Sequence, residues 1–173
     1  MTADKNNGTR FLLRVAIAIS LLAIPSFARA ENKCPWLTEA TAGGLLGGDA
    51  VGSYMAAANG QPAVCAFIDK EGNSMRELTI TVQINPDAHN KLSGMMHDCG
   101  ASSQLLQAIG NEAAVCAMDA RKKFISERVV GRVRDQIFAI TISSTVKDDM
   151  VLNNETLMTK IYTASEQVAG NLF

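Results

Sequence analysis

The chain has 173 residues, of which 47% are hydrophobic and 5% aromatic, and its 16 basic and 17 acidic residues give a formal net charge of −1. A near-neutral chain with few aromatic residues lacks the basic, base-stacking surface of a nucleic-acid-binding protein, so we expect no nucleic-acid partner. The length and the apolar content suit one globular domain with a single hydrophobic core.

The first thirty residues have the pattern of a secretory signal peptide. Cations precede an uncharged apolar run over residues 15–24, and Ala28 and Ala30 supply the small side chains that a signal peptidase requires. The run is too short to span a bilayer as a helix, although an uncleaved anchor helix is the alternative. We therefore expect a signal peptide over residues 1–30, cleavage after Ala30, and a periplasmic or secreted domain over residues 31–173. No later apolar run reaches transmembrane length, so we expect no membrane span in the mature chain.

All four cysteines, Cys34, Cys65, Cys99 and Cys116, lie after the predicted cleavage site. An even number of cysteines in an oxidising compartment favours two disulfides. Pairing of nearest neighbours predicts Cys34–Cys65 and Cys99–Cys116, each stabilising the fold by about 3–4 kcal/mol. The alternative is Cys65–Cys116 with Cys34–Cys99, which would hold if the two "AVCA" segments were adjacent strands.

The first half of the domain predicts a helix followed by a hairpin. Thr38 is a good N-cap and Gly47-Gly48 a helix end, so we expect a helix over 38–47. Residues 50–58 fit either a strand or a short helix. Strands over 62–69 and 76–85 should form a hairpin, because four apolar residues alternate with polar ones in the second of them. These apolar residues are Leu78, Ile80, Val82 and Ile84.

The second half predicts two helices and three strands. Asn85-Pro86 should open a helix that ends near Cys99, and residues 102–109 should be a partly helical connection. Strands are expected over 113–118, 127–134 and 136–144, with a tight turn at Arg134-Asp135. From about residue 149 an apolar stripe at helical spacing predicts a final helix. The stripe consists of Leu157, Ile161, Ala164, Val168 and Leu172.

Short connections and alternating strands predict an α+β fold, in which helices pack on one face of an antiparallel sheet of about five strands. The two halves also resemble each other, since each has an "AVCA" strand and a later "ITV" or "ITI" strand. Either a duplication or chance accounts for this likeness.

No motif predicts catalysis, a cofactor or a metal. The "AVCA" cysteines lie among apolar neighbours, where a reactive thiolate is disfavoured. The only histidines, His89 and His97, match no zinc-binding spacing, and no serine elbow, zinc-protease motif or P-loop is present. We therefore expect a non-enzymatic binding or accessory module. An enzyme with an unrecognised site is the alternative, followed by a redox or metal-handling protein.

The cations are unevenly distributed along the mature chain. Residues 121–134 hold six Lys or Arg residues against Glu127 alone, whereas acids dominate the rest. Strand periodicity places Arg128, Arg132 and Arg134 on one face. They either form a solvated surface or bind an anionic partner, such as an envelope component or an acidic protein.

The segment "CPWLTEATAGGLLG" from Cys34, the "CAF" at Cys65 and the "IGNEA" from Ile109 resemble a family of small exported bacterial domains of unknown function. In that family a cysteine precedes a Leu-Thr helix start, the helix ends in Leu-Gly, and a Cys-aromatic strand follows. The resemblance implies an α+β fold and a Cys34–Cys65 bridge, and it carries over no catalytic residues. The chain lacks the lipobox of the lipoproteins in that family.

Overall fold

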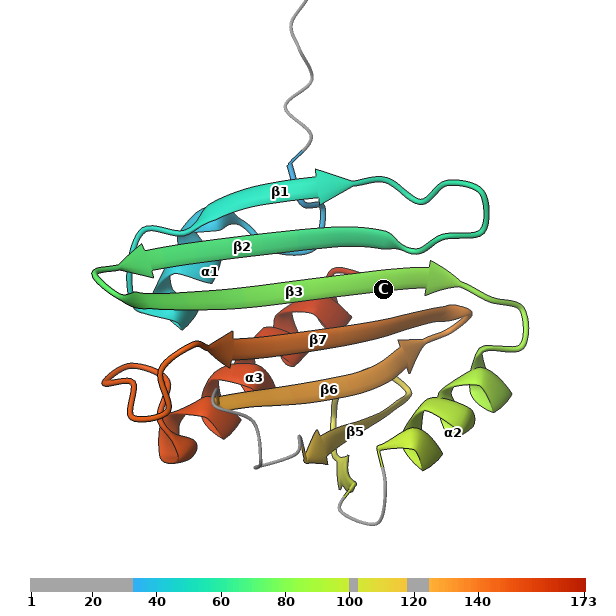
Figure 1. Ribbon diagram of the computed structural model, residues 1–173. Coiled ribbons are helices and arrows are strands. Elements are labelled where there is room, and N and C mark those ends of the chain that lie inside the picture. The colour runs from blue at the N-terminus through green and yellow to red at the C-terminus, as the bar shows by residue number, and fades with distance from the viewer. Residues whose placement is uncertain (1–32, 100–102, 118–124) are drawn as a thin grey trace, which may run out of the picture. The chain divides into compact units, whose positions relative to one another are not determined.

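The computed structural model describes residues 33–99, 103–117 and 125–173 (Figure 1). The predicted signal peptide and the cations Arg121, Lys122 and Lys123 lie outside these ranges. The elements in chain order are α1 (Glu39–Leu46), β1 (Val51–Met55), β2 (Ala63–Glu71), β3 (Ser74–Ile84), α2 (Ala88–Asp98), β4 (Gln104–Leu106), β5 (Glu112–Ala117), β6 (Ile125–Val133), β7 (Gln136–Ser144) and α3 (Asn154–Gly170).

The strands form one seven-stranded sheet in the order β1-β2-β3-β7-β6-β5-β4, and every neighbouring pair is antiparallel. The predicted α+β class and antiparallel sheet are confirmed, but the expected number of strands, about five, is wrong. The additional strands are the two edges. β1 lies within residues 50–58, for which the sequence fits either a strand or a short helix. β4 is a three-residue strand in a segment expected to be partly helical. Such a short strand shows too few alternations to be recognised.

The main hydrophobic core lies on the face of the sheet that α1 and α3 cover, which we name the inner face (Figure 1). Leu78, Ile80 and Val82 of β3 are buried there, as the alternation predicts. Ile84 differs, with 70% of its surface exposed, because β3 ends at this residue. All five residues of the predicted α3 stripe are buried in the same core: Leu157, Ile161, Ala164, Val168 and Leu172.

Helix α2 packs on the opposite face, which we name the outer face, so the expectation that all helices cover one face is wrong. Leu92 of α2 is buried against Val130 of β6 and Ala139 of β7, in a cluster separate from the main core. The physical reason is strand parity, because Val130 and Ala139 are the small apolar residues that project away from the inner face. Helix α2 covers the β5–β6–β7 side only (Figure 1), which leaves the outer face open over β1–β3.

Two disulfides join Cys34 to Cys65 and Cys99 to Cys116. Cys65 belongs to the inner-face core, whereas Cys116 belongs to the outer-face cluster. The first bridge therefore fastens the N-terminal segment to the inner face, and the second fastens the end of α2 to the outer face.

A buried ionic cluster joins the β2–β3 hairpin to the segment before α3. Arg76 Nε donates to both carboxylate oxygens of Asp149 at 3.0 and 2.9 Å, and Arg76 Nη1 donates to Asp69 and Glu71, each at 3.0 Å. Arg76, Asp69 and Asp149 are all buried. Asp149 is buried, whereas the neighbouring Asp148 is exposed. Asp149 differs because its carboxylate is the partner of a buried guanidinium.

Further donors surround the Asp149 carboxylate. Burial alone would raise the pKa of Asp149. Hydrogen bonds outweigh this effect and hold the pKa well below the usual range. Their donors are, in order of effect, Arg76, the Leu152 N–H, and the Ser74 and Ser144 hydroxyls. Asp149 is therefore charged at neutral pH and fixes the chain between β7 and α3.

No helix in the described ranges is both long enough and apolar enough to cross a membrane.

Candidate anion-binding site

Arg128 projects from the outer face of β6, as strand periodicity predicts. The β6–β7 pairing places Arg128 opposite Thr141 and Ser126 opposite Ser143. Opposite residues have Cβ atoms about 5 Å apart, and residues i and i+2 of one strand are about 7 Å apart. The four residues thus form a two-by-two array, which we name the donor cluster.

The donor cluster presents hydrogen-bond donors that the described part of the protein leaves unused. All four residues are partly exposed. Within the part of the chain that the structure describes, none of the four side chains has a hydrogen-bond or ion-pair partner. A guanidinium carries five N–H donors and each hydroxyl adds one, so the array matches the acceptors of an oxyanion.

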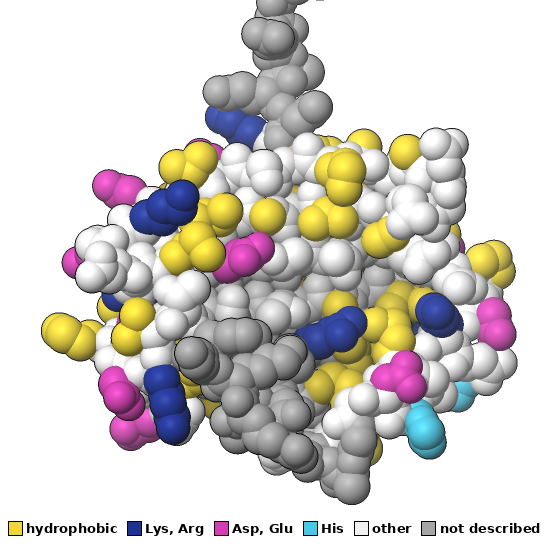
Figure 2. All heavy atoms as spheres, in the orientation of Figure 1, with side chains coloured by type: hydrophobic (Ala, Val, Ile, Leu, Met, Phe, Trp, Pro, Cys, Tyr) yellow, Lys and Arg dark blue, Asp and Glu magenta, His cyan; other side chains and the backbone are white. Residues whose placement is uncertain are grey.

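The outer face next to the donor cluster is mostly uncharged. Glu77 of β3 lies opposite Ser143 and accepts a 3.0 Å hydrogen bond from Thr79 Oγ1. Farther toward β1, Val51 and Ile68 line a shallow recess of about 460 Å³, and the charged residues in its lining are Asp49 and Lys70. Figure 2 shows this face, with hydrophobic and uncharged side chains over most of β1–β3. A bound anion would therefore meet one guanidinium, one nearby carboxylate and a floor of hydroxyl groups.

Arg132, the second predicted cation, is engaged within the protein. It lies on the outer face, and its Nη2 donates to Glu112 Oε1 at 2.7 Å. His89 Nδ1 of α2 lies 3.1 Å from the same carboxylate oxygen. The hydrogen bond from Arg132 lowers the pKa of Glu112 against the opposing effect of burial, and His89 contributes to the lowering. Arg132 thus helps to fasten α2 to the sheet.

Arg134, the third predicted cation, lies beyond the end of β6. It occupies the turn with a positive φ of 56°, and its backbone N–H donates to Asn111 Oδ1 at 2.6 Å. Its guanidinium lies over the Phe173 ring at 5.9 Å from the centroid. The turn conformation ends the strand alternation, so Arg134 does not join Arg128 in one row.

The hydroxyl members of the donor cluster were not identified from the sequence, although a signal for them exists. A two-residue turn at Arg134-Asp135 pairs Val133 with Gln136, and this register carries Arg128 to Thr141 and Ser126 to Ser143. Counting back from the turn would have found all four residues.

The two histidines lie outside the donor cluster, and the four cysteines form the two disulfides. His89 contacts Glu112, whereas His97 lies at the end of α2 with 92% of its side chain exposed. Among the described residues, no three His, Cys, Asp or Glu side chains are grouped so that they could hold a metal ion.

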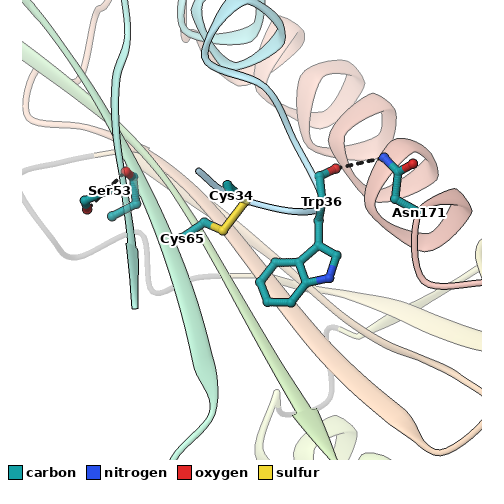
Figure 3. The surroundings of a disulfide bond; sticks show 6 residues. Cys34, Trp36, Ser53, Cys65 and Asn171 are labelled. Atoms are coloured by element: carbon teal, nitrogen blue, oxygen red, sulfur yellow. Dashed lines mark hydrogen bonds between the residues drawn. A yellow bond between two sulfur atoms is a disulfide. The ribbon is translucent and has the colours of Figure 1, made fainter. Parts of the chain in front are cut away.

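The Cys34–Cys65 bridge lies beside Trp36 (Figure 3). The Trp36 ring packs edge-to-face on Tyr54 with 6.1 Å between centroids, and its carbonyl accepts a 2.9 Å hydrogen bond from Asn171 Nδ2. Trp36 is buried. The tryptophan therefore fixes the N-terminal segment to β1 and to the end of α3.

These features define a small, disulfide-stabilised α+β domain with a partly open outer sheet face. Comparisons with family models, curated proteins and solved structures found no match. The resemblance to exported domains of unknown function stays a prediction, and functional inference rests on the donor cluster and its surroundings.

Proposed function

We propose that the chain is an exported, non-enzymatic binding module whose outer sheet face takes an anionic component of the cell envelope. Arg128 is the anchoring cation of this surface. Arg132 and Arg134 belong to the module's framework, because Glu112 and the Phe173 ring already engage them.

One observation carries the proposal: Arg128 is partly buried on an otherwise weakly charged face and, among the described residues, has no partner. The electrostatic attraction between a guanidinium and an oxyanion is stronger when the guanidinium is partly buried than when it is fully solvated, because water screens a partly buried charge less. The three adjacent hydroxyl groups add neutral donors to the same location.

Export is part of the proposal. The predicted leader would take the chain out of the cytoplasm, and two disulfides without a free cysteine in the described ranges suit an oxidising compartment. An envelope component would then be within reach of the outer face.

Retention of the oxidised, leader-free protein on dextran sulfate beads tests the proposal. We expect retention that weakens as salt rises, and no retention on uncharged dextran. Arg128→Ala should elute at clearly lower salt than the wild type. The matched control Arg134→Ala removes the same charge away from the outer face and should elute with the wild type. Equal elution of all three proteins, or no retention of any, would contradict the proposal.

A further inference from the structure

We infer that the donor cluster binds one singly charged oxyanion group of an acidic polymer, and that Glu77 disfavours doubly charged groups. The inference rests on the proposed function and specifies the chemical group that the outer face recognises. Phosphodiesters, sulfate esters and carboxylates share this chemistry.

The charges around the donor cluster set the preferred charge of the ligand. Arg128 is the cation of the cluster, and the charge of Arg132 is neutralised by Glu112 at 2.7 Å. Glu77 lies on the strand next to β7, directly opposite Ser143. One guanidinium compensates one negative charge, and a second charge on the same group would be repelled by the Glu77 carboxylate.

The array also fits the shape of such a group. Arg128 and Thr141 face each other across one step of the β6–β7 ladder, and Ser126 and Ser143 face each other across the next. An oxyanion above the centre of the array lies within reach of a forked guanidinium on one side and hydroxyl donors on the others. Neutral donors add hydrogen bonds without adding charge, which again suits a singly charged group.

A polymer fits this surface better than a membrane does. Adsorption to an anionic bilayer takes a cluster of about four to eight cations. Among the described residues, the donor cluster and the recess beside it offer Arg128 and Lys70 against Glu77 and Asp49. The face is also shallow, with a recess bordered by Val51 and Ile68. A chain of repeating anionic units can lie across it without entering a pocket.

The test measures the affinity of the oxidised, leader-free protein for polygalacturonate, a carboxylate polymer, and for poly(glycerol phosphate), a phosphodiester polymer. Whichever polymer binds identifies the source of the group. Arg128→Ala should weaken binding at least about tenfold, since a charge-assisted hydrogen bond is lost, and Ser143→Ala about threefold. Arg128→Lys should restore part of the loss, and Arg134→Ala should leave the affinity unchanged.

Glu77→Gln is the sharper variant, because a gain of function cannot come from misfolding. Removing this carboxylate should tighten polymer binding about threefold. It should also make inorganic phosphate at pH 8, which is mostly doubly charged, a better competitor relative to methyl sulfate.

The outcomes separate the inference from the proposed function. Polymer binding that depends on Arg128 but is insensitive to Ser143→Ala and Glu77→Gln overturns the inference and leaves the proposed function standing. Binding that is insensitive to Arg128→Ala as well overturns both. Binding to phosphatidylglycerol vesicles without binding to either polymer also overturns the inference. If the protein binds neither polymer and is not retained on dextran sulfate, the inference and the proposed function are both overturned.

Discussion

The Asp149 carboxylate accepts hydrogen bonds from Arg76, from the Ser74 and Ser144 hydroxyls, and from the backbone N–H groups of Val151 and Leu152. At the residue scale, this charge is stable inside the protein only because each of its acceptor positions is occupied. Removing one partner of a buried ion pair leaves the other uncompensated, which costs more than the pair itself contributes.

Asp149→Asn should therefore lower the free energy of unfolding by about 3 kcal/mol, because Arg76 loses its charged partner. Chemical denaturation at pH 7 measures the loss. The neighbouring Asp148→Asn, which changes an exposed carboxylate, is the matched control and should change the free energy by less than about 0.5 kcal/mol. Equal effects of the two substitutions would show that the buried cluster is not what stabilises this region.

Glu127 differs from Asp149, since its Oε2 atom is buried and has no hydrogen-bond partner among the described residues. Burial raises the pKa of this carboxyl group. A raised pKa in the folded state means that the folded protein favours the protonated form of Glu127. The stability that this protonation contributes is complete below the unfolded-state pKa of about 4.3 and is lost as the pH rises through the folded-state pKa.

Glu127→Gln should raise the free energy of unfolding at pH 7 by about 1 kcal/mol, because the amide avoids the charge that burial disfavours. The gain should disappear near pH 4, where the wild-type carboxyl is neutral in the folded protein. Thermal unfolding at the two pH values makes the comparison. A variant less stable than the wild type at pH 7 would mean that the Glu127 charge is favourably placed.

At the element scale, α2 is attached to the sheet at both of its ends. Near its start His89 contacts Glu112, and at its end Cys99 is bonded to Cys116. Between these points its apolar contacts form a small cluster of their own around Leu92. Elements with few buried apolar contacts open more readily than the main core does.

Replacing Cys99 and Cys116 together by serine should release α2 with a loss of about 3 kcal/mol, the value expected for a 17-residue separation. Hydrogen exchange should accelerate in Ala88–Asp98 and remain slow in β3 and β7. The matched control replaces Cys34 and Cys65, whose bridge lies in the inner-face core, and should leave exchange in α2 nearly unchanged. Faster exchange in α2 of the control variant, or unchanged exchange in α2 of the first variant, would show that the Cys99–Cys116 bridge is not what holds α2 to the sheet.

The elements with clear periodicity were predictable from the sequence, and the rest depended on long-range pairing. Strand β3 is predictable because one of its faces is buried, so that apolar residues alternate with polar ones at Leu78, Ile80 and Val82. The apolar stripe of α3 predicts that helix in the same way. Edge strands β1 and β4 have only weak alternation, since little of an edge is buried. The side of the sheet that α2 covers follows from Cys116 projecting to the outer face, which a local pattern cannot reveal.

At the scale of the whole molecule, the two halves are arranged alike. Each runs helix, strand, strand, strand, as α1-β1-β2-β3 and α2-β4-β5-β6, and the two "AVCA" strands, β2 and β5, are each second from an edge. Cys65 and Cys116 project to opposite faces, as a twofold axis along the central strand β7 would require. The "ITV" and "ITI" strands, in contrast, are the neighbours β3 and β7.

This arrangement also explains where the open surface lies. α1 and α3 cover the inner face, whereas α2 covers only the β5–β6–β7 side of the outer face. The outer face therefore stays open over β1–β3, and the donor cluster lies beside this open part, on the β6–β7 pair that α2 also contacts. The sequence pointed to Arg128, but the hydroxyl partners on β7 became apparent only with the strand register.

Chemical-shift mapping by NMR can locate the anion-binding surface residue by residue. The isotope-labelled, oxidised protein is titrated with short dextran sulfate chains, and changes are followed at every backbone amide. If the donor cluster binds the anion, the largest changes occur in Ser126–Val130 and Thr141–Ser143, with little change around Arg134. Largest changes at Arg134 and Phe173, or no changes at saturating ligand, would contradict it.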